Sequence, residues 1–281
     1  MATNYVLLLG KDGNVSQSFQ SLMAADSRFK YSALSYLELK KLVEENMLEE
    51  YFSNITKSYP QLNFWVVYCC GITSPNAPSM NLRAANIDLP MRVLTAILGS
   101  NARLVTFGTI MENYITICEN NPYLHSKLLF SQGLSTINRS SYLHIRLHTL
   151  YGGMKLQSHM FLGQLYNSLK SQKDFIMSRG EQKREYHHID DDVSICLRLI
   201  LLEKSGIVEI NSGQPIRLID LANAVYDFFL PIGRVLPILE SPQFEIFEMN
   251  FKPMSSFDAK PVVFRDPIDG VIDYFREKPI Y

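Results

Sequence analysis

Residues 4–16 read NYVLLLGKDGNVS, an apolar run that stops at a glycine and enters a turn with a second glycine. A continuous apolar run of this length is typical of a buried strand in a parallel sheet. Helical periodicity begins near Val15 and continues to about Ala25, so the turn joins a strand to a helix. A strand, a glycine turn and a helix in this order predict the start of a doubly wound α/β domain.

The same alternation continues through the first 150 residues or so. We expect further strands at 29–35, 64–71, 103–107 and 142–147, and helices over 37–51, over 86–98 and from about Pro122. Apolar strands and right-handed crossovers together predict a Rossmann-like doubly wound parallel sheet. Beyond this region, helices expected over 161–170 and 191–202 alternate with short extended segments, which indicates a smaller mixed C-terminal part. We therefore expect a dinucleotide-binding domain at 1–153 and a mainly substrate-binding part at 154–281, sharing one cleft.

The composition argues against several classes of protein. Hydrophobic residues make up 47% of the chain and charged residues 20%, with a net charge of −1, so no basic excess is available to bind a nucleic-acid backbone. The apolar run at residues 6–9 is too short for a signal peptide or a membrane span. The four cysteines show no metal-ligand spacing, and Cys69 and Cys70 lie inside an apolar run, which suits a reducing compartment. We expect a cytoplasmic protein without nucleic-acid or membrane partners.

The turn after the first strand offers a possible phosphate site. Gly10 and Gly13 permit close backbone approach, and the N-terminus of the following helix presents backbone N–H groups. A plain strand–helix connection is the alternative, because Ser16 stands where dinucleotide-binding turns carry a third glycine. The second strand ends near Ser35 with no acid at the position that would bind the ribose hydroxyls of NAD, while Lys11 could meet a 2′-phosphate. The sequence therefore favours NADP over NAD.

A tyrosine and a lysine four residues apart on one helix supply the acid and the cation that a ketone reductase needs. The ordinary tyrosine pKa is about 10, and a cation one helical turn away lowers it. Tyr123 and Lys127 follow the central strand, which runs into Thr109 at the end of the sheet where α/β proteins bind ligands. The spacing alone does not select this pair, since it recurs at Tyr36/Lys40, Tyr166/Lys170 and Tyr274/Lys278. Position predicts that Tyr123, Lys127 and Thr109 are catalytic, with a surface tyrosine and lysine as the alternative.

The order of these features resembles the extended short-chain dehydrogenase/reductases, the NAD-dependent epimerase/dehydratase family. Residues 10–16 match its glycine motif, residues 66–71 the strand that ends beside the cofactor, and Asn86 the asparagine that opens the next helix. Thr109, Tyr123 and Lys127 occupy the places of its active-site residues. Residues 146–153 resemble its strand with a Tyr-Gly-Pro turn, Gly153 replacing the proline. Residues 180–191 are similar to its Gln-x-Arg-Asp…His-Val-x-Asp segment, whose arginine binds the sugar-nucleotide diphosphate.

The resemblance implies an NAD(P)-dependent oxidoreductase or epimerase that acts on a nucleotide-diphospho-sugar and forms a homodimer through a helix pair. The residues that it places at the cofactor are Gly10, Lys11, Gly13, Asn14, Val15, Ser35, Cys70, Gly71, Asn86, Tyr123 and Lys127. Those that it places at the substrate are Thr73, Thr109, Thr149 and Arg184. No metal is expected at His187 and His188, which have no third ligand spaced near them, and Asp191 is expected to cap the helix that follows.

Departures from the family pattern narrow the range of reactions that we expect this protein to catalyse. Ile110 and Met111 replace the Asp-Glu pair of the 4,6-dehydratases, so no acid and base are evident for eliminating water, and Thr149 replaces a substrate-contacting asparagine. The short loop before Tyr123 and residues 180–182 look most like the small 4-ketoreductases of the abequose and paratose synthase type. We expect NAD(P)H-dependent reduction of the C4 ketone of a nucleotide-diphospho-4-keto-6-deoxysugar in bacterial-type surface polysaccharide biosynthesis. The alternatives are a nucleotide-sugar 4-epimerase with tightly bound NAD and a non-catalytic dinucleotide-binding sensor of the same fold.

Overall fold

The computed structural model describes residues 3–230, 234–237, 249, 251–255 and 261–278. The chain forms two compact units, Met1–Leu147 with Val193–Ile210, and His148–Asp192 with Asn211–Tyr281. The segment from Val193 to Ile210 belongs to the first unit because helix α9 (Ile189–Leu201) leads into strand β10 (Gly206–Glu209), which pairs with the edge of the sheet. The domain boundary that we expected from the sequence, at residue 153, would place residues 193–210 in the C-terminal part instead.

The first unit is built on a six-stranded sheet in which every neighbouring pair of strands is parallel. Across the sheet the order is β10, β5 (Tyr142–Leu147), β4 (Ala102–Thr109), β3 (Asn63–Tyr68), β1 (Asn4–Leu9) and β2 (Phe29–Leu34). Strands β2 and β3 lie on either side of β1, so the direction in which strands are added reverses there. Doubly wound sheets bind ligands at the carboxyl ends of strands beside such a reversal. The expected Rossmann-like α/β fold is confirmed.

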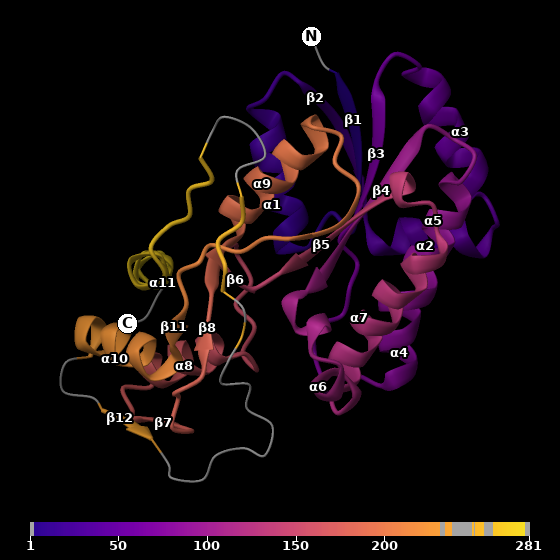
Figure 1. The fold of residues 1–281 in the computed structure, drawn as a ribbon. Coiled ribbons are helices and arrows are strands. Elements are labelled where there is room, and N and C mark those ends of the chain that lie inside the picture. The colour runs from indigo at the N-terminus through magenta and orange to yellow at the C-terminus, as the bar shows by residue number, and fades with distance from the viewer. Residues whose placement is uncertain (1–2, 231–233, 238–248, 250, 256–260, 279–281) are drawn as a thin grey trace. The chain divides into compact units, whose positions relative to one another are not determined.

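Helices cover both faces of this sheet (Figure 1). On one face Leu7, Val66 and Leu104 are fully buried under α2 (Tyr36–Glu44), α3 (Leu48–Ser58), α5 (Leu89–Ile97) and α7 (Pro122–Gly133). Helix α1 (Asn14–Ala24) lies on the other face with α9, and its buried Phe19 ring is 6.1 Å from the Phe107 ring of β4. Each fully buried side chain of this size stabilises the fold by about 1.5–3 kcal/mol.

Two expected helices have different bounds in the structure. The helix expected over 37–51 is divided into α2 and α3, because Asn46 between them adopts a left-handed conformation with φ of 56°. The helix expected from Asn86 begins earlier, with α4 (Ser79–Arg83) and the π-helical turn η1 (Ala84–Asp88), before α5. Asn86 therefore lies within a helical run and does not open it.

In its described residues, the second unit contains short strands and helices around its own core. Strand β6 (Thr149–Tyr151) pairs with β9 (Tyr186–His188), β7 (Phe175–Met177) with β12 (Val235–Pro237), and β8 (Lys183–Arg184) with β11 (Ile216–Arg217). Helices α8 (Phe161–Lys170), α10 (Leu218–Phe229) and α11 (Pro267–Arg276) contribute the fully buried Leu165, Leu221 and Phe275. Asp191 was expected to cap α9 but lies inside its first turn, where the carboxylate accepts the Arg265 N–H group at 3.0 Å. That prediction is wrong.

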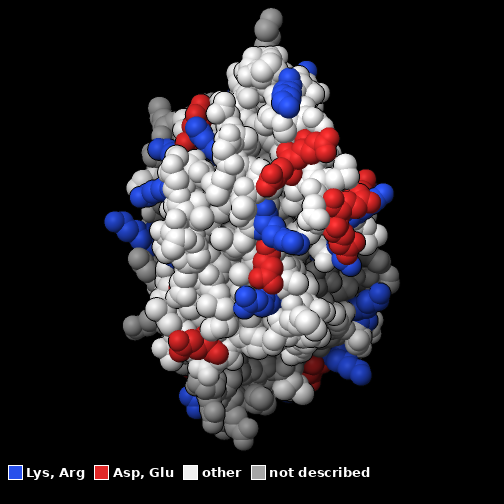
Figure 2. Space-filling model, turned by 90° about the vertical axis from the view of Figure 1, so that its right-hand side faces the viewer, with Lys and Arg blue, Asp and Glu red and all other residues white. Residues whose placement is uncertain are grey.

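Short turns complete the first unit: η2 (Ile110–Asn113), α6 (Ile115–Glu119), η3 (Leu134–Thr136) and η4 (Arg139–Ser141). Within the described ranges, no helix combines the length and the apolar character that crossing a bilayer requires. On the face of the molecule in Figure 2, Lys and Arg are interspersed with Asp and Glu, and wide areas between them carry no charge.

Candidate active site

The glycine turn after β1 brings the backbone unusually close to β3. Gly10 has φ of 98°, and a Cβ added there would lie 2.9 Å from Cys70 Sγ and 3.0 Å from the carbonyl carbon of Cys69. Both the conformation and the contact require glycine. The N–H groups of Gly10 and Lys11 donate to the Leu34 carbonyl at 2.8 and 2.9 Å, which fixes the turn against the end of β2.

Helix α1 starts at this turn. Its N-cap is Gly13, which supplies no side-chain hydrogen bond, and its first turn contains no acidic residue. The first N–H groups of an α-helix are not used within the helix, and the dipole makes this end positive. The turn with Asn14 and Val15 therefore fits a dinucleotide phosphate.

Glu38 is a candidate cofactor residue that the sequence argument missed. Its carboxylate folds back to accept both the N–H group and the hydroxyl of Ser35 at 2.7 Å. It also lies 3.4 Å from Lys11 Nζ in the glycine turn. The hydrogen bonds from Ser35, with the charge of Lys11, hold the pKa of Glu38 at about 2, so the side chain is ionised. The available signal was the Ser-x-x-Glu spacing of a capping box, which returns the acid to the end of β2.

Lys127 lies beside the loop that follows β3. Its Nζ donates to the Phe107 carbonyl of β4 at 2.9 Å. A Cβ added at Gly71 would lie 3.2 Å from both Lys127 Nζ and Asn86 Oδ1, so glycine keeps this space open. Asn86 holds the same loop, accepting the Ile72 N–H group and donating to the Ile72 carbonyl, each at 2.9 Å.

Thr109 and Tyr123 stand at the same end of the first unit. Thr109 ends β4, and its Oγ1 accepts the Met111 N–H group at 3.3 Å, which leaves the hydroxyl proton for another acceptor. Tyr123 is the second residue of α7, whose start Asn121 caps by accepting the Tyr123 N–H group at 3.0 Å. The Tyr123 ring packs in the same small cluster as Met111 and the buried Cys118.

Burial shifts the two titratable groups in opposite directions. It raises the pKa of Tyr123 to about 12, and the nearby Glu112 carboxylate adds to that shift. It lowers the pKa of Lys127 to about 8, which Glu112 opposes. From the sequence we expected Lys127 to lower the pKa of Tyr123, whereas in the structure burial keeps the phenol protonated.

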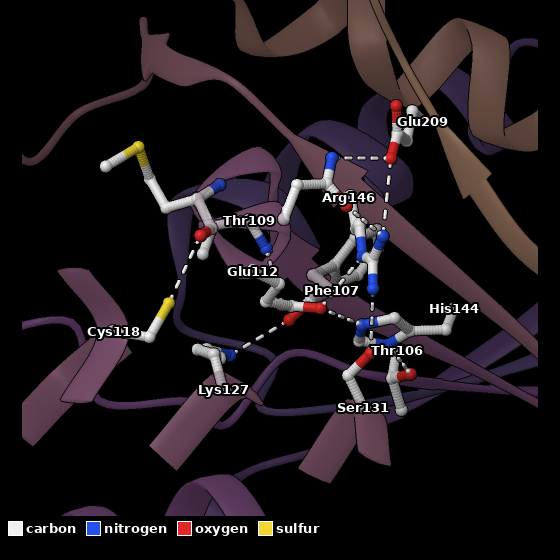
Figure 3. A network of polar contacts seen from close by, with 12 residues as sticks. Thr106, Phe107, Thr109, Glu112, Cys118, Lys127, Ser131, His144, Arg146 and Glu209 are labelled. Atoms are coloured by element: carbon white, nitrogen blue, oxygen red, sulfur yellow. Dashed lines mark hydrogen bonds and ion pairs between the residues drawn. The ribbon is translucent and has the colours of Figure 1, made fainter. Parts of the chain in front are cut away.

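A buried polar network adjoins this end of β4 (Figure 3). Glu112 Oε1 accepts the Thr109 N–H group at 2.8 Å, and Oε2 accepts Arg146 Nε at 3.0 Å. Oε2 also lies 3.1 Å from His144 Nε2, while Nδ1 of the same ring is 2.8 Å from Thr106 Oγ1. The sequence argument missed Glu112, although Thr-x-x-Glu at 109–112 again has the spacing of a capping box.

The other expected substrate residues occupy both units. Thr73 lies in the loop after β3 in the first unit. Thr149 opens β6 and Arg184 ends β8, both in the second unit, and Arg184 Nη1 donates to the Lys183 carbonyl at 2.7 Å. Their contacts with substrate stay predictions. In the part of the chain that the structure describes, no group of three His, Cys, Asp or Glu residues is arranged to hold a metal ion.

A doubly wound parallel sheet with a glycine turn at its reversal point and a threonine, tyrosine and lysine at the same edge defines a Rossmann-like dinucleotide enzyme. Comparison with profiles of protein families matches residues 65–211, just over half of the chain, to the NAD dependent epimerase/dehydratase family. The chain belongs to this family. The expected family and an enzyme that uses NAD or NADP are thereby confirmed.

Solved structures share the fold at low sequence identity. The Bordetella bronchiseptica enzyme WbmH, in complex with NAD+, is 16% identical with a TM-score of 0.75, over 98% of this chain and 99% of its own. The dTDP-4-dehydrorhamnose reductase from Bacillus anthracis, in complex with NADP, is 16% identical with a TM-score of 0.73, over 99% of each chain. A UDP-N-acetylglucosamine 4-epimerase from Methanobrevibacter ruminantium is 14% identical with a TM-score of 0.71, over 99% of this chain and 97% of its own. Comparison with curated proteins finds no match.

Proposed function

We propose that this protein reduces the C4 ketone of a nucleotide-diphospho-4-keto-6-deoxysugar. The observation that supports the proposal is that Lys127 Nζ donates to the Phe107 carbonyl of β4 at 2.9 Å, beside the space that Gly71 keeps open. Thr109 ends the same strand, and Tyr123 lies one helical turn before Lys127 on α7. A nicotinamide dinucleotide, when bound, supplies the hydride for this reduction.

Tyr123 is the proposed proton donor. Its raised pKa keeps the proton on the phenol until an alkoxide, a much stronger base, forms at the sugar. Thr109 donates its remaining hydroxyl proton to the ketone oxygen and orients it. Lys127 stabilises the phenolate that Tyr123 leaves behind, because its ammonium lies one helical turn further along α7.

Arg184 is the proposed ligand of the sugar-nucleotide diphosphate, since a guanidinium binds phosphate oxygens through two parallel hydrogen bonds. Thr73 and Thr149 are proposed to contact the sugar. Binding energy from the nucleotide, remote from the reacting carbon, would hold the ketone in position for the reaction. A nucleotide-linked substrate is also what the names of the similar reductase and epimerase indicate for those proteins.

The direct test is NADPH consumption with a panel of CDP-, dTDP- and GDP-linked 4-keto-6-deoxysugars. We expect turnover of at least one member, with stoichiometric oxidation of the cofactor. Failure of every member of the panel would refute the proposed reduction.

A nucleotide-sugar 4-epimerase is the second candidate, because one similar structure is that of a 4-epimerase and the same three side chains would serve it. An epimerase begins by removing a proton from the sugar, which needs a deprotonated base, whereas the raised pKa of Tyr123 keeps the phenol protonated at rest. Mass spectrometry of the purified protein separates the two candidates. Tightly bound NAD and epimer formation without net cofactor consumption would favour epimerisation.

The pKa of Lys127 predicts how reduction depends on pH. The rate constant kcat/KM should be level below pH 7 and should fall about tenfold per pH unit above about pH 8, as Lys127 loses its charge while Tyr123 stays protonated. Initial rates from pH 6 to 10 measure this profile. In Lys127→Arg, whose side chain stays charged, the fall should disappear, and an equal fall in that variant would assign it to another group.

The pair Lys11–Glu38 predicts a change in cofactor preference. Lys11 favours a 2′-phosphate and the ionised Glu38 opposes it, so Glu38→Gln should raise the ratio of kcat/KM for NADPH to that for NADH about tenfold. Glu44→Gln is the matched control, because Glu44 forms an exposed ion pair with Lys40 on the same helix. An unchanged ratio in Glu38→Gln would show that this carboxylate does not face the ribose.

The homodimer that the family implies and the cytoplasmic location expected from the cysteines stay predictions. Light scattering coupled to size-exclusion chromatography tests the first, with twice the mass of a 281-residue chain as the expected result.

A further inference from the structure

The residue that links Thr109 to the neighbouring strand is Glu112, which lies on the one-turn helix η2 directly after β4. Its side chain is completely buried, as is that of His144 on β5. Gly108 makes this arrangement possible, because a Cβ there would collide with both Glu112 Oε1 and His144 Nε2. The backbone of β4 thus passes in direct contact with a buried carboxylate at Gly108, the last residue but one of the strand.

Both oxygens of this carboxylate have defined partners. Oε1 accepts the Thr109 N–H group at 2.8 Å, so it fixes the peptide that carries the proposed substrate-binding hydroxyl. Oε2 accepts Arg146 Nε at 3.0 Å and lies 3.1 Å from His144 Nε2. With a proton on Nε2, the His144 ring donates to Glu112 and accepts the Thr106 hydroxyl at Nδ1. The carboxylate therefore ties the end of β4 to β5 (Figure 3).

We propose that Glu112 is a positioning residue for the reaction, which fixes Thr109 through its backbone and places a negative charge at the end of β4, the strand whose Phe107 carbonyl holds Lys127 Nζ. The inference rests on the proposed function, since it assigns Glu112 a task in proton transfer by those groups. Glu112 itself touches neither substrate nor cofactor in this account.

The other charged or titratable groups around Glu112 do not supply this negative charge in its place. Arg146, on β5, is shared between Glu112 and Glu209, whose Oε1 lies 3.3 Å from Arg146 Nη1 at the end of β10. Cys118 on α6 stays neutral, because burial raises the pKa of its thiol to about 11. On α7 the carboxylate raises the pKa of both Tyr123 and Lys127. It therefore favours a protonated phenol and a charged ammonium together, the state that donates a proton.

The decisive variant is Glu112→Gln, which keeps a carbonyl oxygen for the Thr109 N–H group but removes the charge. NMR titration of the lysine side chains in the full chain, with the Lys127 signal assigned by Lys127→Met, should show the pKa of Lys127 lowered by about one unit. With the substrate found in the panel, the alkaline fall in kcat/KM should move by the same amount. If Glu112 had only a structural role, Glu112→Gln would lower kcat at every pH. Neither the pKa of Lys127 nor the pH at which kcat/KM falls would then change.

Two further variants separate charge from position. Glu112→Asp keeps the charge but is too short for the Thr109 N–H group, so the pKa of Lys127 should stay near that of the wild type while kcat falls about tenfold. Glu209→Gln removes the other carboxylate on Arg146 and should change kcat/KM by less than about twofold.

An unchanged Lys127 pKa in Glu112→Gln overturns the inference, as does an unchanged kcat in Glu112→Asp. If Glu112→Gln does not fold, the kcat of Glu112→Asp decides whether the inference stands. If neither variant folds, Glu112 is a folding residue and the inference is wrong. Because the NMR titration needs no substrate, a shifted pKa without turnover of any sugar would refute the proposed function and not the electrostatic part of this inference.

Discussion

Tyr123→Phe is expected to lower kcat for ketone reduction by about 10²–10⁴-fold, while the affinity for the dinucleotide changes little. The variant removes only the phenol oxygen and its proton, and a positioned general acid contributes a rate factor of that size. The ring keeps its packing against Met111 and Cys118, so the fold of α7 is preserved. Single-turnover rates with saturating cofactor and the substrate found in the panel measure the effect.

Tyr166→Phe is the matched control for this prediction. Tyr166 and Lys170 have the same spacing on α8, but Tyr166 lies in the core of the second unit and Lys170 is exposed. Its kcat should stay within about twofold of that of the wild type. A loss of less than tenfold in Tyr123→Phe would contradict the acid role, and a protein that binds the dinucleotide without turning over any sugar would support the non-catalytic sensor.

His187→Ala is expected to destabilise the second unit by about 3–5 kcal/mol. The ring nitrogens of His187 lie 2.9 Å from Asp192 and 2.8 Å from Glu185, and all three side chains are buried. Removing the cation leaves two carboxylates buried without their shared partner, and breaking a buried ion pair in this way costs about that much. Urea unfolding followed by hydrogen exchange in residues 148–192 measures the loss.

The pH dependence of stability supplies the control. Burial lowers the pKa of His187, but the hydrogen bonds and charges of Asp192 and Glu185 outweigh it and raise the value to about 9. A raised pKa in the folded state means that the contribution is complete below pH 6.5 and is lost as the pH rises through 9. The wild type should therefore lose about 3 kcal/mol between these values, whereas His187→Ala should lose much less. Parallel curves for the two proteins would show that His187 is neutral in the fold.

Glu185, His187 and Asp192 form one buried cluster, and Glu185 determines how its contribution to stability falls at low pH. Although burial raises the pKa of Glu185, the hydrogen bonds from His187 and Ser212 and the charge of His148 lower it to about 2. A lowered pKa in the folded state means that this contribution is complete above pH 4.5 and is lost as the pH falls through 2. The contributions of Glu185 and His187 are therefore both complete between about pH 4.5 and 6.5.

The sequence predicted the central strands of the first unit well because runs such as Val6–Leu9 and Phe64–Tyr68 are continuously apolar, which is typical of a sheet covered on both faces. It did not predict that residues 206–209 join this sheet, since pairing between β10 and β5 is a contact between distant segments. It also did not show the break at Asn46, where a single left-handed residue ends one helix and allows another to begin.

The expected catalytic residues were predicted from their position along the chain. The two carboxylates of the candidate site, Glu38 and Glu112, were not predicted. Thr109, Tyr123 and Lys127 were identified because they follow the central strand. Glu38 and Glu112 were missed because periodicity states which face of a helix a residue occupies and not where a long side chain ends. Glu38 and Glu112 are each the third residue of a helix, and each side chain folds back to the end of the preceding strand. In the sequence, only the capping-box spacing indicates this arrangement.

The transfer of hydrogen to the sugar tests the central claim most directly. The protein is incubated with the 4-keto sugar and NADPH that carries deuterium at both hydrogen positions of C4 of the nicotinamide, and the product is analysed by mass spectrometry and NMR. Our account predicts one deuterium per product molecule, bound at C4 of the sugar, with one cofactor oxidised for each. A product that forms without deuterium, or without oxidation of the cofactor, would contradict it.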